Sequence, residues 1–228
     1  MKICAISDLH GYLPKDLPES DLLLIGGDIV PSNIQINMPK SLEWLDGEFK
    51  QWCKNQETYQ IVLVGGNHDF VLERKKKEAT KIFEGYGNWF HYLHNEVKTI
   101  NIEGTELTIY GTPYCKIFGN WAFMRDDDKL REYFAECPDE VDIILSHDAP
   151  YGITDVCLER LAYTSEGHIG NVPLRERLNM VNYKYLLHGH LHSSDHQLTE
   201  FKGGYVANVS LLNEKYKPYY KPLLINYE

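Results

Sequence analysis

Five short clusters of aspartate, asparagine and histidine stand out in this chain, because each directly follows a strand-like apolar run. In chain order they are Asp8-Leu9-His10, Gly26-Gly27-Asp28, Gly65-Gly66-Asn67-His68-Asp69, Ser146-His147-Asp148 and His188-Gly189-His190-Leu191-His192. Carboxylate, amide and imidazole groups are donors that hold divalent metal ions. Together they predict two adjacent ions, a centre that favours hydroxide attack on a phosphate ester. The leading interpretation is therefore a hydrolase.

The spacing within the first and last clusters suits metal binding. Residues two apart in an extended backbone point to the same side, so Asp8 and His10 can converge on one ion. His190 and His192 have the same spacing. A carboxylate such as Asp28 can bridge two cations, because its oxygens accept in several directions. Taken alone, the two aspartates could instead close turns, with His10 as a surface residue.

The cluster from residue 65 to residue 69 is the most specific of the five. Its two glycines permit an unusual turn, so that Asn67 can offer its side-chain oxygen to a metal. His68 lies beside that ligand and could protonate the leaving oxygen of a phosphate ester. The competing interpretation is the start of a helix that Asp69 caps.

Four of the ten histidines are predicted to bind metal. His147 is the weakest of these, since a lone histidine after a strand is commonly a hydrogen-bonded loop residue. His188 is expected in the core, and the remaining loop or surface histidines include His91, His94, His168 and His196. The complete predicted ligand set is Asp8, His10, Asp28, Asn67, His147, His190 and His192. Sequence motifs for zincins, phosphate-binding loops and serine hydrolases are absent.

The apolar runs before the clusters have the length of buried strands, and helix-like segments lie between them. Strands are expected at 2–6, 22–25, 61–64, 143–145, 185–187, 205–209 and 223–225. A β-hairpin is expected at 97–110 with its turn at Glu103-Gly104. Helices are expected from a cap at Ser41 to about residue 53, and at 73–83, 127–135 and 172–181. This alternation predicts an α/β protein with its polar residues at strand ends.

Composition is that of an ordinary globular protein of 228 residues, with 43% hydrophobic and 25% charged residues. The net charge of −10 argues against broad binding to long nucleic acids or anionic membranes. A small phosphorylated substrate remains compatible, because two cations would reverse the local charge. The five scattered cysteines predict reduced thiols, and with no apparent signal peptide or membrane span we expect a cytoplasmic protein. One domain over residues 1–228 is the simplest organisation, and the oligomeric state stays open.

The five clusters, in this order, resemble the calcineurin-like metallophosphoesterase superfamily over roughly residues 1–210. The resemblance implies a four-layer α/β/β/α sandwich with two mixed β-sheets. It further implies two divalent metal ions, with Mn²⁺ expected first and Fe, Zn or Ni as alternatives. One ion would be held by Asp8, His10, Asp28 and His192, and the other by Asp28, Asn67, His147 and His190. By the same resemblance, His68 would contact the phosphate or protonate the leaving group. Our hypothesis for the mechanism is that Asn67 and His68 both orient the phosphate.

Within this superfamily the chain looks most similar to the small brain-type metallophosphodiesterases, through Gly111-Thr112-Pro113-Tyr114 and Trp121-Ala122-Phe123. That resemblance implies a phosphodiesterase acting on cyclic nucleotides or similar small diesters. Alternatives are a phosphomonoesterase and a non-catalytic interaction protein on the same fold. The chain departs from protein phosphatases after Asp28, where Ile29-Val30-Pro31-Ser32 replaces Asp-Arg-Gly, and it carries Asp148 after His147.

The aromatic residues that follow the hairpin have two interpretations. Tyr114, Phe118, Trp121 and Phe123 could stack on a flat leaving group beside the metals, or they could form a hydrophobic patch that supports their loop. Arg125 could bind a second phosphate, although pairing with the acidic residues 126–128 is the simpler expectation.

Overall fold

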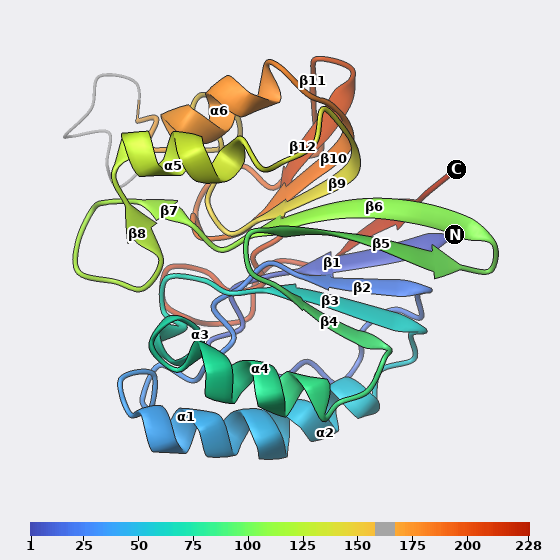
Figure 1. Ribbon diagram of the computed structural model, residues 1–228, viewed down its shortest axis with the longest axis vertical. Helices are drawn as coiled ribbons and strands as arrows, with labels where there is room; N and C mark the ends of the chain where they lie inside the picture. The colour runs from blue at the N-terminus through green and yellow to red at the C-terminus, as the bar shows by residue number, and fades with distance from the viewer. Residues whose placement is uncertain (158–166) are drawn as a thin grey trace.

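Two β-sheets face each other in the centre of the molecule, and helices cover the outer face of each (Figure 1). The computed structural model describes residues 1–157 and 167–228. From one side to the other the layers are helices, sheet, sheet and helices, and both sheets contain parallel and antiparallel strands. The expected α/β architecture, a four-layer sandwich with two mixed sheets in a single domain, is confirmed.

The first sheet has five strands in the order β13-β1-β2-β3-β4. Their bounds are β1 Lys2–Ile6, β2 Leu22–Ile25, β3 Gln60–Val64, β4 Phe90–Leu93 and β13 Leu223–Asn226. Strands β1 to β4 run parallel, and β13 is antiparallel to β1. The apolar runs predict four of these strands. Strand β4 escapes prediction because it is short and has His91 and Tyr92 at its centre.

The second sheet has six strands in the order β11-β12-β10-β9-β6-β5. Their bounds are β5 Glu96–Ile102, β6 Thr105–Thr112, β9 Glu140–Ser146, β10 Asn182–His188, β11 Thr199–Phe201 and β12 Gly204–Asn208. Strands β5 and β6 form the predicted hairpin, with Ile102 opposite Thr105. A separate parallel pair consists of β7 Cys115–Lys116 and β8 Met124–Arg125.

The helices over the first sheet begin earlier than expected. The elements α1 Met38–Trp44, η1 Leu45–Phe49 and α2 Lys50–Lys54 follow one another directly. The expected cap at Ser41 is wrong, because Asn37 caps this helix by accepting a hydrogen bond from the Lys40 amide at 3.2 Å. Ser41 is buried in the helix, where its hydroxyl donates to the carbonyl of Ile34.

The other helices complete both outer layers. The single helix expected at 73–83 is instead α3 Phe70–Arg74 and α4 Lys76–Glu84, which break at Lys75 and pack with the first sheet. Helices α5 Asp127–Phe134 and α6 Val172–Leu178 cover the second sheet (Figure 1), close to their predicted starts. Among the described residues, no helix has the length and apolar character needed to cross a bilayer.

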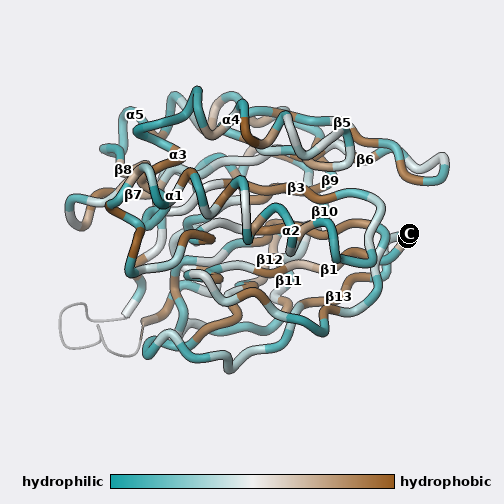
Figure 2. The backbone as a smooth tube through the Cα atoms, turned by 90° about the horizontal axis from the view of Figure 1, so that it is seen from below, coloured by the Kyte–Doolittle hydropathy of each residue, from teal (hydrophilic) through white to brown (hydrophobic). Residues whose placement is uncertain are grey.

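Both faces of the strands β1, β2 and β3 are buried, which explains why they read as continuous apolar runs. Alternate side chains such as Ile3 and Leu24 pack between the two sheets, whereas Ile6 and Leu23 belong to the cluster on the helix side. Figure 2 shows brown stretches along the strands and mostly teal on outer helices such as α5. Strong burial of the strands fixes the positions at which the chain leaves the sheet.

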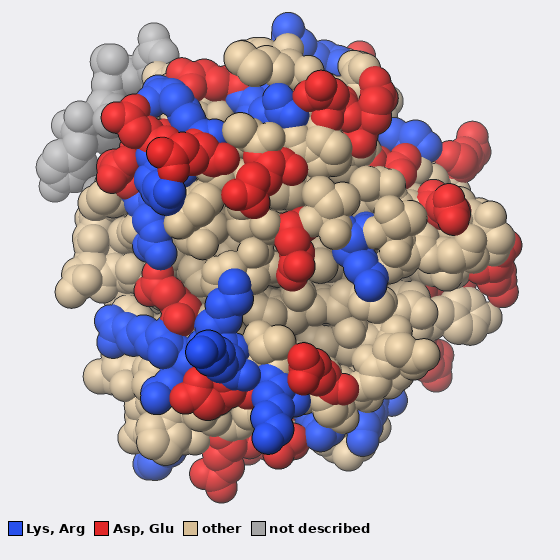
Figure 3. All heavy atoms as spheres, viewed as in Figure 1, with Lys and Arg blue, Asp and Glu red and all other residues tan. Residues whose placement is uncertain are grey.

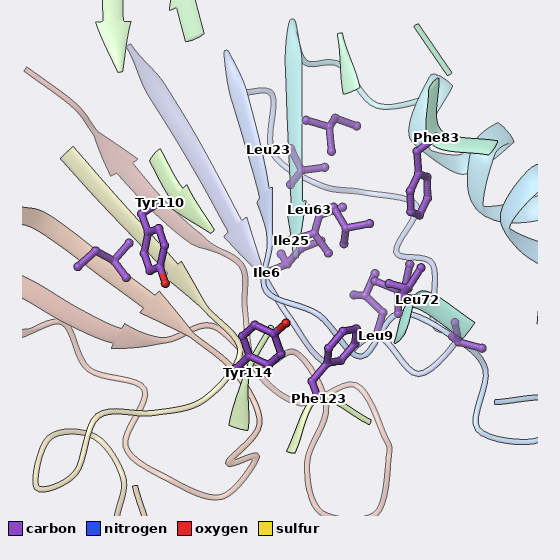
Figure 4. Packing of buried hydrophobic residues seen from close by; sticks show 14 of the residues in the cluster. Ile6, Leu9, Leu23, Ile25, Leu63, Leu72, Phe83, Tyr110, Tyr114 and Phe123 are labelled. Atoms are coloured by element: carbon purple, nitrogen blue, oxygen red, sulfur yellow. The ribbon is translucent and has the colours of Figure 1, made fainter. Parts of the chain in front are cut away.

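The apolar core extends up to the loops that carry the polar clusters. Figure 4 shows Ile6, Ile25 and Leu63 near the ends of β1, β2 and β3, continuing toward Leu9 and Phe123. Because β1, β2 and β3 are parallel to one another, and β9 is parallel to β10, their carboxyl ends lie at shared sheet edges. All five polar clusters begin at these strand ends, as the sequence predicts.

Candidate metal centre

Left-handed backbone conformations bring the donor side chains out of the strand direction. Four donors that are not glycine have positive φ angles, namely Asp8 at 55°, His10 at 44°, Asp28 at 51° and His190 at 69°. This conformation costs roughly 1–2 kcal/mol for a residue with a side chain, so it persists only where the surroundings impose it. Such strain concentrates at functional sites, and here it occurs in three of the five clusters.

Close approach between the loops explains the glycines of the clusters. A Cβ atom on Gly66 would collide with the Asp28 carboxylate, and one on Gly189 would collide with the carboxylate of Asp8. These glycines therefore allow backbone from one loop to reach the carboxylate of another. The glycines of the Gly-Gly-Asn-His-Asp and Gly-His-Xaa-His patterns are thus explained by the close packing of the loops, and the other residues of the patterns supply the donors.

The first donor group consists of Asp8, His10 and His192, whose donor atoms lie within 4.8 Å of one another. Nε2 of His192 is 3.2 Å from Oδ1 of Asp8, and Nε2 of His10 is 3.7 Å from Oδ2 of Asp28. Nε2 of His10 is buried and has no hydrogen-bond partner among the described residues. A buried ring nitrogen without a partner is costly unless it binds something else. A cation between these donors would satisfy it.

The second donor group shares Asp8 with the first and adds Asp28 and His147, again within 4.8 Å. Nε2 of His147 lies 3.5 Å from Oδ2 of Asp28 and 2.9 Å from Oδ1 of Asn67. The rings of His147 and His190 are 5.2 Å apart. All seven predicted donors therefore converge, and the Asp28 carboxylate lies near both His10 and His147, where a bridging carboxylate is expected.

Further hydrogen bonds orient the donors. Nδ1 of His147 lies 2.7 Å from the carbonyl oxygen of Gly26, and Nδ1 of His192 lies 3.1 Å from that of Asn213. A carbonyl only accepts, so each Nδ1 carries its proton and leaves Nε2 for a metal. Asp8 is held by the hydroxyl of Ser210, which donates to Oδ2 at 2.8 Å. Ser210 lies outside the five clusters in the sequence, and no sequence pattern singles it out.

Asp69 has a different role from the helix cap considered above. Its carboxylate accepts hydrogen bonds from the amides of Ile29 and Val30 and from the amide of Gly66, at 2.9–3.0 Å. Asp69 is fully buried, and burial together with the charge of Asp28 raises its pKa to about 7. Through these hydrogen bonds, Asp69 joins the loop after β2 to the loop after β3.

The charges of the site favour a cation between the carboxylates. Burial alone opposes a charge on His147, but Asp28 and Asp8 outweigh it and raise the pKa of His147 to about 10. Likewise, Asp8 outweighs burial at His192 and raises its pKa to about 9. Burial dominates at His10 and lowers its pKa to about 4. The carboxylates thus draw positive charge to this place, and the oxygen and nitrogen donors fit two divalent cations.

A cavity of about 520 Å³ opens over the donors. Its lining combines polar site residues with the rings of Phe118, Trp121 and Tyr216. Tyr216 lies 4.5 Å from the ring of His10, and Trp121 lies 4.4 Å from that of His68, measured between ring centroids. No sequence pattern indicates Tyr216, which reaches the site from a turn near the end of the chain.

Only part of the aromatic group considered in the sequence faces the cavity. Phe118 and Trp121 line it, whereas Tyr114 and Phe123 are buried in the core (Figure 4). The stacking interpretation is therefore wrong for Tyr114 and Phe123. Arg125 pairs with Glu73 at 3.1 Å, so its expected pairing with residues 126–128 is also wrong.

The remaining residues in question make internal contacts. The carboxylate of Asp148 accepts hydrogen bonds from the amide of Lys116 and from the side chain of Asn171, both at 3.0 Å, which fixes strand β7 beside the cavity. His188 is buried, as expected, with Nε2 2.7 Å from the hydroxyl of Thr154. His91, His94, His168 and His196 also contact neighbouring polar groups of the fold.

Comparisons with known proteins found relatives by sequence and by structure. A probable rhamnogalacturonate lyase C from Emericella nidulans is 29% identical over 199 residues, which are 84% of this chain but only 17% of that protein. Metallophosphoesterase domain-containing protein 1 from Homo sapiens is 24% identical over 246 residues, covering 99% of this chain and 70% of that protein. The structure of a hypothetical protein from Thermus thermophilus has the same fold, with a TM-score of 0.50 and 15% identity, over 93% of this chain and 76% of that one.

The family comparison covers most of the chain. The family model described as calcineurin-like phosphoesterase matches residues 1–194, a range that includes all five polar clusters. The expected resemblance is confirmed: the chain belongs to the calcineurin-like phosphoesterase family.

Proposed function

We propose that this protein is a phosphodiesterase that uses two divalent metal ions to hydrolyse a small, nucleotide-like phosphodiester. Family membership supports the coarser assignment, a metal-dependent phosphoester hydrolase. The observation that carries the proposal is the pair of overlapping donor groups that share Asp8, beneath a cavity large enough for a small molecule.

In this proposal the donors divide between two cations. Asp8, His10, Asp28 and His192 hold one, and Asp28, Asn67, His147 and His190 hold the other. When bound, such a pair neutralises phosphate oxygens and lowers the pKa of water. Mn²⁺ is the proposed ion, with Fe, Zn or Ni as alternatives, since mixed nitrogen and oxygen donors accept all of them.

Two residues of the third cluster act on the phosphate. The amide of His68 donates to Oδ1 of Asp28 at 2.7 Å, so the backbone of His68 is fixed to the centre of the site. Its ring lines the cavity, from which it can reach a leaving oxygen and protonate it. The side chain of Asn67 also lines the cavity, and it orients the phosphate next to its metal.

The surroundings of the site favour a small substrate over a polymer. Phe118, Trp121 and Tyr216 offer flat apolar surfaces for a base or another ring. In the described part of the face shown in Figure 3, basic side chains gather at the lower left with acidic side chains beside them, and acidic side chains are spread over the rest. Together with the net charge of −10, this supports neither long nucleic acids nor anionic membranes as partners. All five cysteines are free thiols, which supports a reducing compartment such as the cytoplasm.

Metal analysis followed by assays with two esters tests the proposal. Protein loaded with Mn²⁺ is expected to contain two ions per chain and to hydrolyse bis-p-nitrophenyl phosphate faster than p-nitrophenyl phosphate. The reverse preference would identify a phosphomonoesterase. Protein that holds two ions but hydrolyses neither ester, nor any member of a phosphoester metabolite panel, would instead be a non-catalytic interaction protein on this fold.

A further inference from the structure

Gln35, in the loop between β2 and α1, contacts the ring of His68. The side-chain oxygen of Gln35 lies 2.7 Å from Nδ1 of His68. An amide oxygen only accepts hydrogen bonds, so Nδ1 carries the proton and donates it. The ring of Trp121 also packs against that of His68, at 4.4 Å between centroids. Because Nδ1 is engaged by Gln35, Nε2 is the nitrogen that remains for a substrate oxygen.

The loop that carries Gln35 has its own hydrogen bonds. The amide of Ile34 donates to the carbonyl of Pro31 at 3.0 Å, and the amide of Asn37 donates to the carbonyl of Ile34 at 2.7 Å. The hydroxyl of Ser41 donates to the same Ile34 carbonyl at 3.0 Å. None of these bonds uses the side chain of Gln35, so a substitution there can remove the contact with His68 and leave the loop in place.

We propose that Gln35 is a positioning residue that fixes the tautomer of His68 for proton transfer, an inference that rests on the proposed function. The imidazolium form of His68 carries a proton on each ring nitrogen. As the bond between phosphorus and the leaving oxygen breaks, its electron pair stays on that oxygen, which takes the Nε2 proton. The neutral ring that remains has its proton on Nδ1, the tautomer from which Gln35 accepts. The proton that the attacking water loses passes through solvent to Nε2, which restores the starting form of the ring.

An amide performs this task without adding charge to the site. Asp8 and Asp28 are already two buried carboxylates within the same centre. Glutamate at position 35 would keep an acceptor for Nδ1 of His68 but add a further negative charge beside Asp8 and Asp28, whereas leucine would remove the contact altogether.

Leaving-group dependence separates this role from a structural one. The holoenzyme and its Gln35→Leu and Gln35→Glu variants are assayed on aryl methyl phosphates from p-nitrophenyl to p-methoxyphenyl. Nitrophenolate leaves without a proton, but the less acidic phenols need one. Gln35→Leu should slow the p-methoxyphenyl ester roughly 10- to 100-fold and the p-nitrophenyl ester less than about threefold. The rate of Gln35→Glu on the p-methoxyphenyl ester should lie between the rate of Gln35→Leu and that of the protein without a substitution. Ile36→Ala, a neighbour that is 74% exposed, is the matched control and should match the unchanged chain.

Nitrogen NMR of the Zn²⁺-loaded protein provides a readout that needs no turnover. The protein is labelled with ¹⁵N-histidine, and the signal of His68 is assigned by its loss in His68→Asn. The neutral ring of His68 should carry its proton on Nδ1. In Gln35→Leu, a larger fraction of the rings should carry it on Nε2. Equal slowing of all esters with an unchanged tautomer would overturn the inference, and so would unchanged rates and spectra. If the tautomer changes as expected but the unchanged chain cleaves no ester, the proposed function fails while the positioning contact stands.

Discussion

The metal centre and the wall of its cavity are built differently. The donors Asp8 and His147 are completely buried, follow strands directly and are held by hydrogen bonds to other loops. The wall residues Phe118 and Tyr216 are 46% and 47% exposed and lie on loops. We call the layer of donors beneath the wall the floor of the cavity. The core therefore constrains the wall less than it constrains the floor.

Under the proposed function, this difference separates the residues that carry out the reaction from the residues that select the substrate. Side chains at the ends of buried strands are held in one geometry, which a metal site needs because its donors must converge. Residues on exposed loops can change without disturbing that geometry, so they are suited to choose the leaving group. Substitutions in the floor should change metal content or turnover, whereas those in the wall should change substrate preference.

The substitution Asp28→Asn should have the largest effect. Asp28 lies close to His10 and His147, so asparagine at this position, which lacks the negative charge, should hold both proposed ions more weakly. We expect turnover to fall on the order of 10³-fold or more and fewer than two ions to remain. Elemental analysis and assay of the same sample measure this, with the exposed Asp128→Asn as control. Two retained ions and nearly full activity would show that Asp28 does not bridge.

The substitution His68→Ala should separate metal binding from proton transfer within the floor. The alanine keeps the backbone amide that donates to Asp28, so both ions should stay bound. Turnover of an ester with a poor leaving group should fall roughly 100-fold. Stopped assays on such an ester, with metal content measured in parallel, check both statements. Unchanged turnover would exclude His68 as the acid.

A smaller effect is expected for Ser210→Ala, which tests whether the hydrogen bond that orients the donor Asp8 matters for metal binding. Ser210 donates to Oδ2 of Asp8 at 2.8 Å, and losing such a contact typically weakens metal affinity about 10- to 100-fold. Competition with a chelator measures the affinity, and Thr105→Ala in the exposed hairpin is the control. If both variants bind metal equally well, Asp8 is oriented by its other contacts alone.

The convergence of the candidate donors could be predicted from the sequence because each follows a buried strand. The apolar runs at β1, β2 and β3 show where the chain leaves the sheet, and Asp8, Asp28 and Asn67 come soon after them. Parallel strands then bring these side chains to one edge. Strand β4 lacked such a signal, and the helix start at Asn37 was missed because the apolar face of that helix begins a turn later.

The supporting contacts could not be predicted because they join loops that are remote in sequence. Ser210 and Asp8 are 202 residues apart, and Gln35 and His68 are 33 residues apart. Neither Gln35 nor Ser210 belongs to a motif, and no local pattern distinguishes them from other polar loop residues. Tyr216 was missed for the same reason.

The smallest expected effect belongs to the wall. Phe118→Ala removes an exposed ring that lies 5.2 Å from the ring of His190. If Phe118 stacks on a flat leaving group, its loss should raise KM roughly tenfold for aryl esters, because a single stacking contact is worth about 1–3 kcal/mol. KM for alkyl esters and the metal content should stay unchanged. Ile117→Ala, at a neighbouring position that also lines the cavity, should change KM less because it removes no ring. Lower turnover of all esters, or loss of an ion, would show that the wall and the floor act as one unit.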